Sequence, residues 1–120
     1  GDKQIISELY VRGRLLVKFE EWTKAGEIFA EILHRLEAHP YPSIGFQVEC
    51  KYWIAQALYE NDQPVEAYKL ADDALQQSEE RDKDTELEGQ FESFDKIKDH
   101  LEDFYDDLKE EIELSGDLSG

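Results

Sequence analysis

Residues 13–32 read GRLLVKFEEWTKAGEIFAEI, and residues 55–74 read AQALYENDQPVEAYKLADDA. Small or apolar residues occupy matching positions in the two stretches, 42 residues apart: Gly13, Leu16, Ala25, Phe29 and Ile32 in the first, and Ala55, Leu58, Ala67, Ala71 and Ala74 in the second. Within each set the spacings are three, nine, four and three. Two sets in register indicate an internal repeat.

Apolar residues recur at intervals of three and four along most of the chain, which is the period of one helix face. This pattern predicts a helix pair at about 3–38, a second pair at about 45–81 and a long helix at about 87–114. The last helix has one apolar face and one acidic face, so it is expected to cap the second pair. We therefore expect a single all-α domain over 1–114, followed by a disordered polar tail at 115–120.

The expected helix boundaries are marked by local signals. The first two helices meet near Glu20, and the segment Pro40–Gly45 forms a loop, because proline keeps the residue before it out of the helical conformation. In the second pair, Asp62 is placed to cap the next helix, with Pro64 in the first turn of that helix.

Small residues in the repeat predict where the helices cross. A bulky side chain at a crossing holds two helix axes apart, whereas a small one lets them approach closely. We therefore expect Gly13 to pack opposite Ala25, and Ala55 opposite Ala67. Larger residues would fill the flanks of each crossing.

The pattern resembles the tetratricopeptide repeat, whose two helices also cross at small residues, and Phe19–Ala25 resembles the inter-helix turn of that family. The resemblance implies antiparallel helix pairs in a right-handed superhelical array, here two pairs plus the long C-terminal capping helix. The period departs from the usual value of about 34 residues. Ile32 and Ala71 also depart from the family pattern, at positions that are usually small and large respectively. A generic helical bundle is the alternative.

The resemblance also implies a function. In this family the first helices of successive pairs line a concave groove that binds a peptide or a partner helix, which predicts a non-catalytic protein–protein interaction scaffold or adaptor. The groove residues that it implies are Tyr10, Arg14, Val17, Lys18, Glu49, Tyr52, Gln56, Tyr59 and Glu60. Alternatively, these tyrosines pack against the fifth helix.

Charge is distributed unevenly along the chain. Residues 1–60 carry 7 Lys or Arg and 9 Asp or Glu, a net charge of −2, whereas residues 61–120 carry 6 and 21, a net charge of −15. Such a field repels nucleic acid and anionic lipid, so the expected partner is a protein or peptide, with a basic one favoured. An alternative function follows, in which an acidic chaperone or mimic shields a basic protein through Asp103, Asp106 and Asp107. Alternatively, the acidity only maintains solubility.

The sequence contains no glycine-rich phosphate loop, nucleophile elbow or zinc-binding helix motif, so we expect no enzyme, cofactor or metal site. Cys50 is the only cysteine and has the position of a small core residue. Without a disulfide, an export signal or an apolar run long enough to cross a bilayer, we expect a soluble cytoplasmic protein. It would be a monomer or a weak homo-oligomer.

Overall fold

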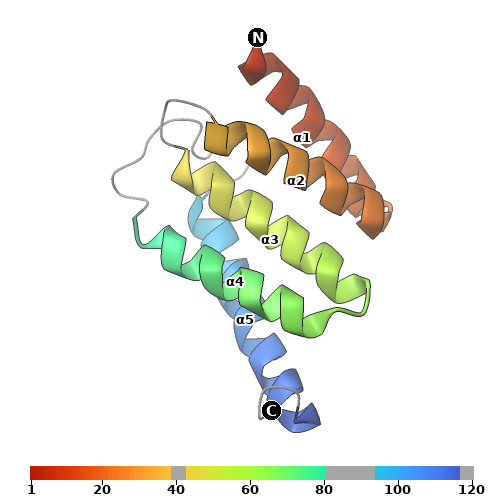
Figure 1. Ribbon diagram of the computed structural model, residues 1–120, viewed down its shortest axis with the longest axis vertical. Helices are drawn as coiled ribbons and strands as arrows, with labels where there is room; N and C mark the ends of the chain where they lie inside the picture. The colour runs from red at the N-terminus through yellow and green to blue at the C-terminus, as the bar shows by residue number, and fades with distance from the viewer. Residues whose placement is uncertain (39–42, 81–93, 117–120) are drawn as a thin grey trace.

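The computed structural model of the chain describes residues 1–38, 43–80 and 94–116. Within these ranges the chain is all-helical, as predicted, and consists of α1 (Asp2–Lys18), α2 (Trp22–Ala38), α3 (Ile44–Glu60), α4 (Pro64–Ser78) and α5 (Phe94–Ser115) (Figure 1). Residues 40–42 of the expected Pro40–Gly45 loop, the expected start of the last helix near residue 87 and most of the expected tail lie outside the described residues. The predicted loop was too long, because Ile44 and Gly45 already belong to α3.

The internal repeat is present in the backbone. Helices α1 and α3 both have 17 residues, and α3 begins 42 residues after α1. Helix α4 likewise begins 42 residues after α2. The three-residue turns that join α1 to α2 and α3 to α4 therefore occupy equivalent places in the two halves of the repeat.

Both turns have the same geometry. Glu20 and Asp62 have φ angles of 57° and 65°, in the left-handed region that residues other than glycine rarely adopt. The next backbone N–H after each of them donates to a carbonyl of the helix that is ending, with N···O distances of 2.9 Å from Glu21 to Leu16 and 2.9 Å from Gln63 to Leu58. This bonding satisfies carbonyls at the helix end and ends the helix sharply.

One predicted role at these turns is wrong. Asp62 was expected to cap α4, but its left-handed backbone makes it part of the turn that ends α3. The residue at the N-cap of α4 is Gln63, which makes no side-chain capping hydrogen bond. Pro64 does occupy the first turn of α4, as predicted, where its missing N–H has no helical partner to lose.

Helix α3 is the centre of the packing. It packs against α2 and α4, and it also contacts α5. On the side of α1 and α2, it contributes Phe46 and Cys50 to one buried cluster, and on the side of α4 and α5 it contributes Val48 and Tyr52 to another. Burial also raises the pKa of the Cys50 thiol, which keeps this core residue in its unreactive neutral form.

Small residues allow the close approach of the helices. A Cβ atom on Gly13 would lie 2.8 Å from Cε2 of Phe29, and one on Gly26 would lie 3.0 Å from Cβ of Ala57. Gly13 therefore sits against the ring of Phe29 in α2, and its packing opposite Ala25 stays a prediction. In the second pair, Ala55 and Ala67 are fully buried in one cluster, as expected.

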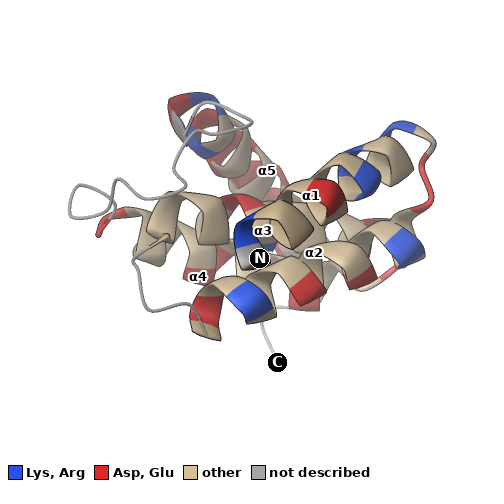
Figure 2. Cartoon of the chain, turned by 90° about the horizontal axis from the view of Figure 1, so that it is seen from above, with Lys and Arg blue, Asp and Glu red and all other residues tan. Residues whose placement is uncertain are grey.

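Helix α5 lies against α4 and α3 with its apolar face inward. Four aliphatic side chains on that face are buried: Ile97, Leu101, Leu108 and Ile112. Figure 2 shows that α5 and α1 both carry acidic and basic positions. No helix among the described residues combines the length and the apolar character needed to cross a membrane.

Replacing Ala67 with Leu tests the helix crossing in the second pair. Extra methyl groups at a fully buried site force neighbouring side chains out of their preferred rotamers, so Ala67→Leu should lower the free energy of unfolding by about 1 to 3 kcal/mol. Urea denaturation measures the change. Ala30→Leu, on the exposed side of α2, is the matched control and should stay within about 0.5 kcal/mol. Equal urea midpoints for the two variants would contradict the placement of Ala67 at a helix crossing.

Glycine substitutions at two sites test the turn geometry, because the free energy of unfolding should rise at one site and fall at the other. Glu20→Gly should raise the free energy of unfolding by about 0.5 to 1 kcal/mol, because glycine adopts a positive φ without steric cost. Glu27→Gly, in the exposed interior of α2, should lower it by about 1 kcal/mol through lost helix propensity. Thermal unfolding of both variants measures the effect. Destabilisation by both would refute the left-handed conformation at Glu20.

Candidate functional site

Three of the predicted groove residues meet where α1 contacts α3. The hydroxyl of Tyr10 donates to Oε2 of Glu49, and Arg14 Nη1 donates to the Tyr10 oxygen at 2.7 Å. Trp53 Nε1 donates to the same Oε2 of Glu49 at 3.1 Å, while the Arg14 guanidinium lies 4.7 Å from the Trp53 ring centroid. These four side chains form a polar network that connects α1 to α3.

The network stabilises the buried carboxylate of Glu49. The side chain of Glu49 is only 7% exposed, and Arg14 Nη1 lies 3.8 Å from its carboxylate. A buried carboxylate is tolerated when donors and an opposite charge surround it. Burial, followed by the nearby charge of Glu49, raises the pKa of Tyr10, so its hydroxyl stays protonated and available as a donor.

Two predicted groove tyrosines belong to the core rather than to an open surface. Tyr10 is 4% exposed and its ring packs edge-on against Phe29 and Phe46. Tyr52 is 6% exposed and packs edge-on against Phe104 of α5, with ring centroids 6.0 Å apart. The alternative in which the tyrosines pack against the last helix therefore describes Tyr52, and also Tyr59, whose ring meets Phe104. It does not describe Tyr10, which packs between α2 and α3.

Two further predicted residues of α3, Gln56 and Tyr59, line a cleft between α3 and α5. Its volume is about 330 Å³, and its walls are Gln56, Tyr59, Phe104, Asp107, Leu108 and Glu111. Tyr59 and Phe104 meet edge-on, with ring centroids 6.0 Å apart. The cleft thus combines an apolar wall with two carboxylates.

A second hollow adjoins the cleft and shares Tyr59 and Glu111 with it. Its other lining residues are Glu60, Asp62 and Pro64, at the end of α3 and the start of α4. The hydroxyl of Tyr59 donates to Oε1 of Glu111 at 3.3 Å, across the boundary between the two hollows. The charge of Glu111, together with partial burial, raises the pKa of Tyr59.

The acidic residues of α5 differ in whether they line the cleft. Asp107 lines the cleft, whereas the exposed Asp103 and Asp106 are not among the residues that line it. Lys18 is exposed in the last turn of α1. The structure therefore brings Gln56, Tyr59 and Asp107 together, and leaves Lys18 and the other two aspartates outside the cleft.

The α5 side of the cleft was missed, although a signal for it was present. Phe104, Asp107, Leu108 and Glu111 are spaced by three, one and three, so they share one helical face. Sequence spacing alone does not say which helix this face meets. That information comes from the packing of α5 on α3.

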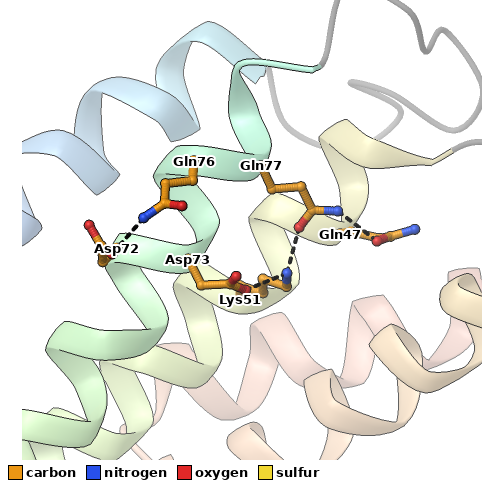
Figure 3. Close-up of polar contacts among 6 residues, drawn as sticks. All are labelled: Gln47, Lys51, Asp72, Asp73, Gln76 and Gln77. Atoms are coloured by element: carbon orange, nitrogen blue, oxygen red, sulfur yellow. Dashed lines mark hydrogen bonds and ion pairs between the residues drawn. The ribbon is translucent and has the colours of Figure 1, made fainter.

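A separate polar cluster joins α3 to α4 on their outer side (Figure 3). Lys51 Nζ lies 2.7 Å from Oδ2 of Asp73 and 2.6 Å from Oε1 of Gln77. Gln77 Nε2 in turn donates to Oε1 of Gln47 at 2.8 Å. Because these side chains bind one another, the cluster holds the two helices together. Gln76, which bonds to Asp72 of its own helix, lies beside it.

Helix α1 also exposes apolar side chains. Val11, Leu15 and Phe19 are 56%, 50% and 71% exposed and follow one another at intervals of four residues. Their spacing places them on one face of the helix and its C-terminal end. Exposed apolar groups that lie together are typical of contact surfaces.

Removing one hydroxyl tests the network around Glu49. Tyr10→Phe keeps the buried ring but removes a donor from a buried carboxylate, which should lower the free energy of unfolding by about 1 to 3 kcal/mol. Tyr59→Phe removes a hydroxyl whose partner is exposed, so it should cost no more than about 0.5 kcal/mol. Urea denaturation at neutral pH compares the two. Equal losses would show that the carboxylate does not depend on Tyr10.

Comparisons with known proteins were made for the whole chain. None of the protein-family models, curated proteins or solved structures matches it. The functional assignment therefore rests on the geometry of the cleft and of the surfaces around it.

Proposed function

We propose that the chain is a non-catalytic protein-interaction scaffold or adaptor that binds a peptide or a partner helix on the side formed by α1, α3 and α5. The observation that carries the proposal is the cleft between α3 and α5, where Gln56 and Tyr59 lie opposite Asp107. Concave sites with apolar walls and a few polar groups are typical of ligand recognition.

A tetratricopeptide-like array is the architecture that we propose for this module. It is supported by the 42-residue repeat of the helix starts and by the matching left-handed turns at Glu20 and Asp62. The ribbon in Figure 1 reverses direction at both turns, in keeping with antiparallel helices joined by short connections. In such an array α1 and α3 are the first helices of their pairs, and α5 continues the row.

Contacts between the odd-numbered helices support a continuous binding side. The bond between Tyr10 and Glu49 connects α1 to α3, and the ring contact between Tyr59 and Phe104 connects α3 to α5. The α1 end of this side is filled by its own polar network. Binding is therefore proposed at the α5 end, where the cleft is open.

The chemistry of the cleft favours binding over catalysis. Acid–base catalysis by paired carboxylates needs two environments that separate the pKa values of the pair. Asp107 and Glu111 are both exposed on the same helix, so both carboxylates are in contact with solvent. Tyr59 offers a ring and a hydroxyl that suit a contact surface.

A second candidate function is the shielding of a basic protein by the acidic surface of α5. The exposure of Asp103, Asp106 and Asp107 on one helix favours it. In that case binding would depend on the whole acidic surface, and blocking the cleft would have little effect. The two candidates therefore predict different responses to a change inside the cleft.

Blocking the cleft tests the proposed function. Peptides would be selected from a random phage-displayed library against the full chain, and their affinities measured by calorimetry. Gln56→Trp places an indole at the cleft wall and should weaken binding about tenfold, which corresponds to about 1.4 kcal/mol. Gln76→Trp makes the same exchange at an exposed position of α4 outside the cleft and should leave the affinity unchanged.

Two outcomes would contradict this location. Peptides that bind equally well to both tryptophan variants do not use the cleft. If Phe19→Ser then abolishes their binding, the contact surface is the exposed apolar face of α1. Circular dichroism of each variant provides the control for folding.

A further inference from the structure

The lining of the cleft has a single sign of charge. Together with the adjoining hollow, it presents the carboxylates of Glu60, Asp62, Asp107 and Glu111. None of the described residues that line either hollow is a lysine or an arginine. Negative groups around a concave, partly apolar surface focus the field and raise the local concentration of cations.

The cleft is also aromatic, which restricts the kind of cation that fits. The rings of Tyr59 and Phe104 stand at 89° to each other, so the cleft offers both a ring face and a ring edge. The face of an aromatic ring attracts a cation. A flat guanidinium can stack on such a face while its N–H groups bind carboxylates in pairs, and it is more weakly hydrated than an ammonium group.

Two of the carboxylates are placed to repel each other. Asp107 and Glu111 are four residues apart on α5, which brings like charges together on one helical face and destabilises the helix. Within the described structure, the donor that crosses the cleft to this pair is the Tyr59 hydroxyl, at 3.3 Å from Glu111. A bound cation would relieve the repulsion and add donors that a single hydroxyl does not supply.

We propose that the partner segment anchors itself through one arginine side chain, whose guanidinium enters the cleft, stacks against Tyr59 or Phe104 and pairs with Asp107 and Glu111. This inference rests on the proposed function, because it names the chemistry of the segment bound at the same site. It distinguishes a specific anchor from the diffuse attraction of a basic protein by α5.

The test uses the peptides that Gln56→Trp weakens. Each arginine in such a peptide is replaced in turn by citrulline, which keeps the planar shape but removes the charge. One replacement should weaken binding about tenfold or more, and the others should change it little. Replacing the critical arginine by lysine should recover only part of the affinity, because lysine cannot bind in the same planar, paired manner.

Matched charge variants locate the anchor on the protein. Asp107→Asn with Glu111→Gln removes two charges from the cleft, and Asp103→Asn with Asp106→Asn removes two from the same helix outside it. The first pair should weaken the peptide about tenfold, and the second pair less than about twofold at physiological salt. In the Asp107→Asn, Glu111→Gln double variant, replacing the critical arginine of the peptide by citrulline should no longer weaken binding. The reason is that the arginine and these two carboxylates interact with each other.

Several results would overturn the arginine anchor, and they can be distinguished from results that would overturn binding at the cleft. Cleft-binding peptides that contain no arginine, or that keep their affinity with lysine or citrulline at every position, would remove the arginine anchor while leaving the cleft as the binding site. Equal losses from both charge pairs, with a steep fall in affinity as salt rises, would assign binding to the acidic surface as a whole. A selection in which no peptide is weakened by Gln56→Trp would refute both the anchor and the cleft.

Discussion

Close approach of the helices to α3 is the constraint on which the rest of this structure depends. At Gly26 a single added carbon would lie 3.0 Å from the side chain of Ala57, so α2 and α3 have almost no space between them there. Ala55 and Ala67 are likewise fully buried where α3 and α4 pack. Because small side chains let neighbours approach from several directions, α3 buries residues around much of its circumference.

The packing of α3 divides the side formed by α1, α3 and α5 into a filled part and an open part. Near α1 the space is occupied by Tyr10, Glu49 and Trp53, which must bind one another because a buried carboxylate without donors is costly. Near α5 the side chains of Gln56 and Tyr59 leave a cleft. The same helix thus borders a filled polar core near α1 and, near α5, the open cleft at which we propose that a partner binds.

Acidity has two different consequences along α5. Four of its aliphatic side chains are buried, so the charges lie on the remaining faces. Asp103 and Asp106 are exposed and do not line the cleft. Asp107 and Glu111 lie on the face that carries Phe104, so their charges act beside an aromatic wall. Identical residue types on one helix therefore differ in their surroundings, depending on whether they line the cleft.

The sequence by itself determined the helices, their repeat and the inward face of α5, because these depend on residue spacing along one chain. It did not determine the backbone at Asp62, where the end of α3 outweighs the capping preference of aspartate. It also left open whether Tyr10 and Tyr52 face a partner or the core, since a tyrosine suits both environments. Only the tertiary structure decided this, by placing Phe46 against one ring and Phe104 against the other. The cleft itself was decided in the same way, because its walls come from helices whose contact depends on packing between segments far apart in the chain.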